Sequence, residues 1–166
     1  MISVSSDLEP DLDDVPTPAL LRAARGAYGQ AIRRALGDRR IEDMPPNGPF
    51  VIGGIGNHGQ PLGALVRRLR VTKQAASELV DTLVLRGFLS RTPDPDDRRR
   101  VNVTLTDRGR AAADAVLAGV LAVDRELAEL VGVAGLEQLR AGLVALCDIR
   151  DRMESEPLPR TDRIAG

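Results

Sequence analysis

Residues 61–105 carry the clearest pattern of the chain and read PLGALVRRLRVTKQAASELVDTLVLRGFLSRTPDPDDRRRVNVTL. The segments Pro61–Leu69 and Thr72–Arg86 both place apolar residues at helical spacing, and only a two-residue turn separates them. Two short helices joined by so tight a turn are typical of a helix-turn-helix unit, in which Thr72 is suited to cap the second helix. The side of that helix that we expect to face the core consists of Ala76, Leu79, Val80 and Leu83.

A β-hairpin is expected directly after the second helix. Gly87 is suited to end that helix, and the apolar start of Phe88–Arg91 then favours a short strand. The segment Thr92–Arg98 is rich in Asp and Pro and predicts a turn, whereas Arg100–Leu105 alternates polar and apolar residues like a half-exposed strand. A hairpin behind two helices predicts a winged helix-turn-helix.

Further helices are expected on both sides of this core. Thr17 is expected to cap a helix whose first turn contains Pro18. Thr106 is suited to cap a long helix, and Gly132 and Gly135 should interrupt it. Apolar residues recur at steps of three and four in each of these segments. The expected helices are 17–36, a weak one at 50–55, 106–131 and 136–153.

The expected fold class is mainly α with a small β-hairpin wing, in which the winged helix-turn-helix is flanked by N- and C-terminal dimerisation helices. The apolar stripes of the flanking helices exceed what so small a core can cover, which favours mutual burial between two chains. The predicted organisation is a disordered acidic arm (1–16), a single domain (17–155) with its core at about 48–105 and dimerisation helices at about 17–36 and 106–153, and a polar tail (156–166).

Composition excludes several classes of function. The chain has 166 residues, a formal net charge of −1, one histidine and one cysteine. His58 alone cannot form a multi-histidine metal site or a histidine-based triad with a choice of partners, and Cys147 alone cannot form a disulfide. We therefore expect no catalytic residue, metal or cofactor. The acidic N-terminus lacks a signal pattern and the longest apolar run, Ala115–Val123, is 9 residues, so we expect a cytoplasmic protein without a membrane span.

Charge is distributed unevenly along the chain, and the basic part coincides with the predicted winged helix. Residues 60–110 hold eleven bases and six acids, whereas the two ends are acidic. A basic middle is a plausible footprint for nucleic-acid phosphates. The candidate contact residues for double-stranded DNA are Thr72, Lys73, Gln74, Ser77 and Glu78 of the second helix, and Asp97, Arg98, Arg99 and Arg100 of the wing tip.

The chemistry of these residue types suits two grooves. Gln can pair with adenine and Glu can accept from cytosine in the major groove, while Lys73 and the capped helix start suit phosphate. Arginines at a loop tip can enter a narrow minor groove, where negative potential is concentrated. Asp97 would lie beside Arg99 and could hold its guanidinium group.

Two stretches resemble the MarR family of regulators. Residues 71–83 (VTKQAASELVDTL) with the exit 86–89 (RGFL) look like its recognition helix, and 94–99 (DPDDRR) with 103–109 (VTLTDRG) look like its wing and the start of its long helix. The resemblance covers about residues 60–110. It implies a transcription regulator, here expected to be a repressor, that acts as a homodimer on a palindromic operator, with Arg99 in the minor groove and Asp97 as its support.

The resemblance also implies a possible small-molecule effector, whose cleft we would place around Tyr28 and Phe50. The chain departs from the family in two places. Residues 53–56 are glycine-rich where the family usually has a firm helix, and Glu78 stands where it often has a basic or small polar residue. Cys147 lies in the last helix rather than near the N-terminus, so redox sensing is not transferred and a buried thiol is expected.

Two other interpretations remain open. Gly54, Gly56 and Gly59 form a formal dinucleotide fingerprint, with Asp81 as its acid, but Asp81 falls in a helix and not on a second parallel strand, which disfavours an oxidoreductase. The alternative that competes directly is a winged-helix interaction module without DNA binding. The acidic net charge and Glu78 favour that module, and the wing arginines oppose it.

Overall fold

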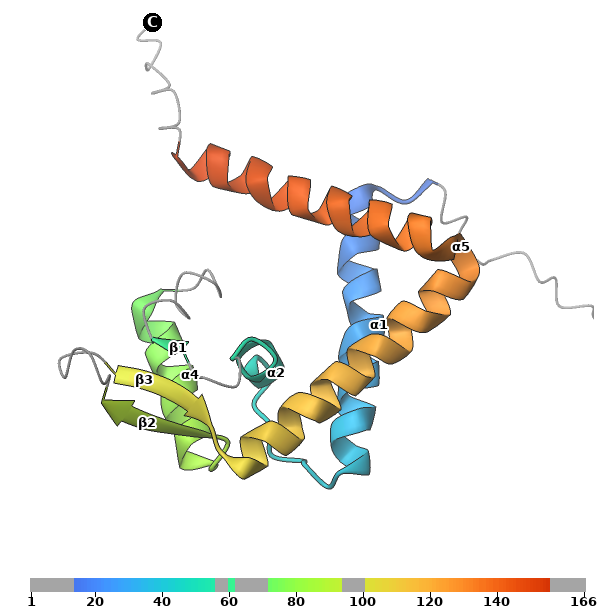
Figure 1. The fold of residues 1–166 in the computed structure, drawn as a ribbon. Coiled ribbons are helices and arrows are strands. Elements are labelled where there is room, and N and C mark those ends of the chain that lie inside the picture. The colour runs from blue at the N-terminus through green and yellow to red at the C-terminus, as the bar shows by residue number, and fades with distance from the viewer. Residues whose placement is uncertain (1–13, 56–59, 62–71, 94–100, 156–166) are drawn as a thin grey trace, which may run out of the picture. The chain divides into compact units, whose positions relative to one another are not determined.

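The computed structural model describes residues 14–55, 60–61, 72–93 and 101–155 (Figure 1). These residues form helices joined by a small antiparallel sheet, so the predicted fold class is confirmed. The helices and strands are α1 (Thr17–Asp38), α2 (Gly48–Ile52), β1 (Gln60–Pro61), α4 (Lys73–Leu85), β2 (Leu89–Pro93), β3 (Val101–Leu105) and α5 (Asp107–Ser155).

The sheet contains the predicted hairpin and one strand that the sequence did not predict. Its order is β1-β3-β2, with both pairings antiparallel. In the hairpin, Leu89 lies opposite Leu105 and Pro93 lies opposite Val101. Pro61, expected to start a helix, instead belongs to β1 and lies opposite Asn102. A strand of two residues shows no alternation, so no sequence pattern could distinguish it from a helix start.

The core gathers apolar residues from α1, α2, α4, β2, β3 and the start of α5. Phe88 is its largest fully buried side chain, at 0% exposure. Ala76, Val80 and Leu83 of α4 are buried as predicted, and Leu79 is half-buried. The other buried residues include Val51 and Ile52 of α2, Leu89 of β2, Val103 of β3, and Ala112 and Ala115 of α5.

Two helix ends are formed as predicted, and a third differs from the prediction. The Thr72 hydroxyl accepts a hydrogen bond from the Ala75 amide at 3.2 Å, as an N-cap does. Gly87, with a φ of 73°, ends α4 as predicted. The prediction of Thr17 as a cap is wrong, because Pro16 is the N-cap of α1 and no side chain caps it. Proline fixes a φ that suits a helix start without a side-chain bond.

The long C-terminal helix is interrupted once. Gly132 has a non-helical φ of 75° and ψ of 163°, whereas Gly135 is helical, so only the first of the two predicted interruptions is present. Residue contacts divide the chain into two units, Met1–Val123 and Asp124–Gly166. The prediction of a single domain over 17–155 stays a prediction.

By length and composition alone, α5 is apolar enough to cross a membrane. The sequence analysis counted only uninterrupted apolar residues and therefore missed this property of the helix.

Candidate nucleic-acid interface

The exposed side of α4 carries the predicted contact residues of the recognition helix. Thr72, Gln74 and Glu78 are exposed, and Ser77 is half-buried. Gln74 and Glu78 share one face and lie opposite the buried Ala76, Val80 and Leu83, because side chains three and four positions apart share one face of a helix. The side chain of Lys73 lies outside the described part of the structure. The helix therefore presents amide, hydroxyl and carboxylate groups to solvent from a well-packed support.

Two of these exposed side chains are bonded to each other. Gln74 Nε2 donates a hydrogen bond to Glu78 Oε1 at 2.9 Å, one helical turn further along. Glutamate is an acceptor only, so the amide of Gln74 must turn its NH₂ group, and not its oxygen, towards Glu78. The sequence analysis treated the two residues separately, although their spacing of four was a signal for this pair.

An ion pair connects the recognition helix to the hairpin. Arg91 Nη1 of β2 lies 2.5 Å from Asp81 Oδ1 of α4. Both side chains are partly exposed, at 35% and 56%, so the pair contributes little to stability but restrains the strand relative to the helix. Sequence reasoning assigned no contact role to Arg91, because its partner lies on a different element. Asp81, the acid of the formal dinucleotide fingerprint, is therefore a helix residue that contacts a hairpin arginine.

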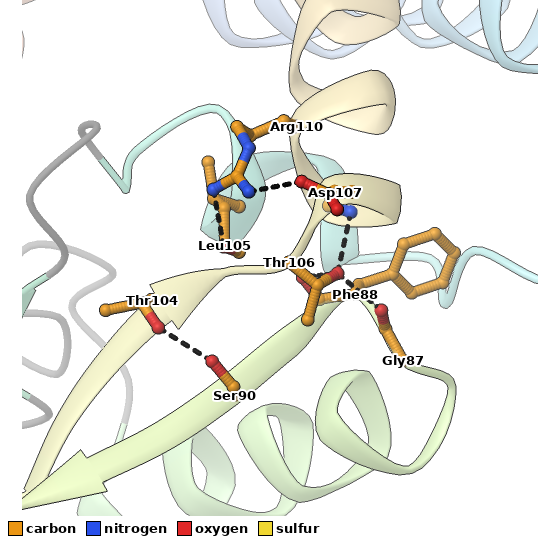
Figure 2. A network of polar contacts seen from close by, with 9 residues as sticks. Gly87, Phe88, Ser90, Thr104, Leu105, Thr106, Asp107 and Arg110 are labelled. Atoms are coloured by element: carbon orange, nitrogen blue, oxygen red, sulfur yellow. Dashed lines mark hydrogen bonds and ion pairs between the residues drawn. The ribbon is translucent and has the colours of Figure 1, made fainter.

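The base of the hairpin is fastened to the start of α5 by one threonine (Figure 2). The Thr106 hydroxyl donates to the Gly87 carbonyl at 2.6 Å and accepts from the Gly109 amide at 3.0 Å. The Thr106 amide also donates to the Phe88 carbonyl at 3.1 Å. The predicted cap thus joins three segments: the exit of α4, the hairpin and the long helix.

Further polar contacts support the same junction (Figure 2). The Ser90 and Thr104 hydroxyls lie 2.7 Å apart across the paired strands. Arg110 Nη1 donates to the Leu105 carbonyl at 3.0 Å and its guanidinium also pairs with Asp107. The strands that lead to the wing tip therefore leave the core in a defined direction.

A second cluster joins the exit of α4 to the loop between α1 and α2. Arg108 Nη2 lies 2.6 Å from Asp43 Oδ1, and its guanidinium stacks 4.3 Å from the centroid of the Phe88 ring. Arg108 also donates to the Arg86 carbonyl, and Arg86 donates to the Asp43 carbonyl. Because these residues are up to 65 positions apart, no sequence pattern could indicate the cluster.

The remaining predicted site residues are only partly placed. Asp97, Arg98, Arg99 and Arg100 lie outside the described residues, in the connection between the paired Pro93 and Val101. Tyr28 is half-buried on α1, and Phe50 is 55% exposed on α2, with the Arg25 guanidinium 5.8 Å from its ring centroid.

Two further expectations concern metals and Cys147. Among the described residues, no three His, Cys, Asp or Glu side chains are grouped so that they could hold a metal ion. Cys147 is exposed on α5 within the single chain, so the prediction of a buried thiol is wrong for it. Its apolar neighbours in sequence suggested burial, but that stripe of α5 is not covered within the chain.

The polar helix α4, the antiparallel hairpin packed behind it and the long helix that follows define a winged-helix protein. The model of the MarR family matches residues 43–100. The crystal structure of a probable transcriptional regulator from Pseudomonas aeruginosa is 28% identical, with a TM-score of 0.63 and coverage of 82% of this chain and 99% of that one. Residues 43–100 are thus similar to the MarR family, and the fold is shared with a probable transcriptional regulator.

Two other similar proteins show the range of the likeness. The transcriptional repressor MdtR of Bacillus subtilis is 28% identical over 100 residues, which are 57% of this chain and 64% of that protein. The structure of Streptococcus pneumoniae FabT in complex with DNA has a TM-score of 0.68 at 18% identity and covers 82% of this chain and 95% of that one, a likeness of fold. The chain spans less than two thirds of the length of the curated relatives that it matches.

Proposed function

We propose that this chain is a sequence-specific, double-stranded DNA-binding transcription regulator of the cytoplasm, which acts as a homodimeric repressor on a palindromic operator. The observation that carries the proposal is the exposed polar face of α4, held from behind by buried Ala76, Val80 and Leu83 and joined to the hairpin through Asp81 and Arg91. A helix of this kind can enter the major groove while an adjacent wing reaches the backbone or the minor groove.

In this proposal, each contact residue has a separate role. Thr72 and Lys73 at the start of α4 bind phosphate, because a helix N-terminus presents free amides and a positive dipole end. Gln74, Ser77 and Glu78 face base edges, where hydrogen bonds specify sequence. The wing tip residues Asp97, Arg98, Arg99 and Arg100 contribute charge at the minor groove, with Arg99 inserted and Asp97 supporting it.

The proposed regulation is release from DNA by a small molecule bound near Tyr28 and Phe50. Both belong to the helices α1 and α2, which precede the recognition helix in the same unit. A ligand that bound better to a spacing of the two recognition helices that does not fit DNA would shift the protein away from the DNA-binding form. Ligands found by thermal-shift screening should lower DNA affinity, and binders that never do so would contradict this part of the proposal.

The central experiment is selection of bound duplexes from a random pool, followed by titration of the winning site and of random DNA at several salt concentrations. We expect a site with two-fold symmetry, and an affinity that falls steeply with salt because bound phosphates release counterions. An asymmetric site would contradict the dimer on a palindrome. Absence of any enrichment would contradict sequence-specific binding.

A second function, a protein-interaction module without DNA binding, is favoured by one observation. The exposed face of α4 carries the two acids Glu78 and Asp81, which repel phosphate when unpaired. Both acids, however, are engaged, Glu78 by Gln74 and Asp81 by Arg91. Salt-dependent binding to duplex DNA distinguishes the two functions, since an interaction module would bind no duplex at any salt concentration.

A further inference from the structure

Glu78 stands on the proposed DNA-reading face although its negative charge is unfavourable beside phosphates. Its carboxylate accepts a hydrogen bond from Gln74 Nε2 at 2.9 Å, and both side chains are exposed. Between exposed residues four positions apart, such a bond adds little to helix stability. Stability alone is therefore a weak reason for an acid at this position.

The bond has a chemical consequence for what Gln74 presents. A primary amide carries two N–H hydrogens and one carbonyl oxygen, and a free glutamine can turn either group towards a base. Because the Glu78 carboxylate can only accept, it fixes which end of the amide is NH₂. One hydrogen is used by Glu78, and one N–H and the carbonyl oxygen of Gln74 remain available.

That remaining pair of groups is selective. Adenine presents an acceptor at N7 beside a donor at N6 in the major groove, which matches one N–H and one carbonyl oxygen. Guanine presents two acceptors, at N7 and O6. The Gln74 carbonyl and the Glu78 carboxylate would both oppose those acceptors, so an oriented amide rejects guanine more strongly than a freely rotating one.

We propose that Glu78 is a positioning residue that orients the Gln74 amide for adenine and against guanine in the major groove. This inference rests on the proposed function, because it concerns the base preference of the same helix. The position of Gln74 supports it, since the second residue of α4 lies in the first turn, the part of a recognition helix that contacts base edges.

The test is a double-mutant cycle on DNA. The full-length wild-type protein, Gln74→Ala, Glu78→Ala, Glu78→Gln and the Gln74→Ala/Glu78→Ala double variant are titrated against the selected duplex. Each is also titrated against duplexes with guanine in place of each adenine, and against random DNA. Circular dichroism and thermal unfolding of every variant provide the folding control. Glu78→Gln is the matched control, because it removes the charge and has both an acceptor oxygen and an NH₂ group, so it can bond to Gln74 in either orientation.

We expect the wild type to prefer adenine at one position by about tenfold or more, as a bidentate contact does. Gln74→Ala should remove that preference. Glu78→Ala should lower it to about threefold or less while binding random DNA more tightly, because a negative charge is lost. Glu78→Gln should gain the same random affinity and also lose adenine preference, because its amide can donate to the Gln74 oxygen and no longer fixes which end of Gln74 is NH₂. The double variant should be no less selective than Gln74→Ala alone.

Three results would overturn the inference while leaving the proposed function intact. One is full adenine preference in Glu78→Ala. Another is full adenine preference in Glu78→Gln, which would show that an acceptor-only partner of Gln74 is not needed. The third is a further loss of selectivity on adding Glu78→Ala to Gln74→Ala, which would make Glu78 a base reader in its own right. If the wild type bound no duplex, the proposed function itself would fail.

Discussion

Thr106 shows how one side chain can determine the geometry of a junction. Its hydroxyl donates to the Gly87 carbonyl at 2.6 Å and accepts from the Gly109 amide at 3.0 Å. Thr106→Val keeps the shape of the side chain but removes both hydrogen bonds. We expect the free energy of unfolding to fall by about 1–3 kcal/mol, from the lost cap and the unpaired carbonyl.

Urea unfolding of Thr106→Val and Thr106→Ser measures this effect. Serine keeps the hydroxyl and should cost less than valine. A loss of stability in Thr106→Ser with none in Thr106→Val would show that the methyl group of Thr106, and not its hydroxyl, is the important part.

Substitution of the wing arginine should weaken DNA binding without changing the preferred sequence. Arg99→Ala should weaken binding to all duplexes and lower the salt dependence by about one released ion per protomer, because a cationic contact is lost. Asp97→Asn should do the same more mildly. Arg140→Ala, an exposed arginine of α5, is the control. Titrations at several salt concentrations check this, and an unchanged slope in Arg99→Ala would exclude a phosphate or minor-groove contact.

Single residues differed in how well the sequence could predict them. The caps Thr72 and Thr106 were predictable, because a cap is a bond within one helical turn. Arg91 and Asp43 were not, because their partners Asp81 and Arg108 lie on other elements. The bond between Gln74 and Glu78 is local and was missed although its spacing was visible.

Among the elements, α1 and α5 cross where a glycine leaves room. A Cβ on Gly119 would lie 2.7 Å from Ile32 Cα and 2.8 Å from Ile32 N, which are backbone atoms of α1. Gly119→Ala therefore has to separate the two helices, and we expect it to destabilise the protein by about 1–3 kcal/mol. Alanine otherwise favours a helix over glycine, so the expected sign is opposite to the intrinsic propensity.

Gly142→Ala is the matched control for Gly119→Ala. Gly142 lies in the same helix, and an added Cβ would meet nothing within 4 Å. We expect Gly142→Ala to be neutral or to stabilise the protein by up to about 1 kcal/mol. Denaturant unfolding at one fixed protein concentration compares the two. Stabilisation by both substitutions would mean that the helices do not pack closely at Gly119.

The elements themselves were largely predictable because periodicity is a local property. The 3.6-residue pattern located α1, α4 and α5, and alternation located the hairpin. Boundaries shifted at the end of the first helix, expected at residue 36 and found at Asp38, and at Pro61, which belongs to β1. Gly135 stays helical because its place in α5 needs no positive φ, whereas Gly132 adopts one.

At the scale of the whole molecule, a large apolar surface is left uncovered in the single chain. Leu139, Leu143, Leu146 and Ile149 of α5 are 39–44% exposed and recur at steps of three and four. Helices with such a stripe need a partner surface. We expect light scattering at micromolar concentration to give about twice the chain mass of 17.8 kDa.

Substitutions on the stripe test this dimer. Leu143→Glu should shift the mass towards the monomer, because it places a charge in the proposed interface. Ala141→Glu places the same charge on a different side of the helix and should leave the dimer intact. A wild-type monomer that still binds a palindromic site tightly would contradict the proposal.

The helical fold class was predictable from composition, whereas the surface that covers the apolar stripe was not. The scarcity of aromatic residues, at 2%, indicated a helical protein built on aliphatic side chains. The sequence of an apolar stripe does not determine whether the same chain, another chain or lipid covers it. The exposure of Cys147 in the single chain illustrates this, since its sequence neighbours suggested burial.

The small sheet has edges, and both edge strands end in proline. The strand order β1-β3-β2 leaves β1 and β2 outermost, and they end at Pro61 and Pro93. Proline has no amide hydrogen to donate, so a strand from another molecule cannot form a regular ladder of hydrogen bonds with either edge strand at these positions. At these two positions, proline disfavours pairing of the sheet edges between molecules. Concentrated solutions should accordingly resist the β-rich fibrils that open strand edges can seed.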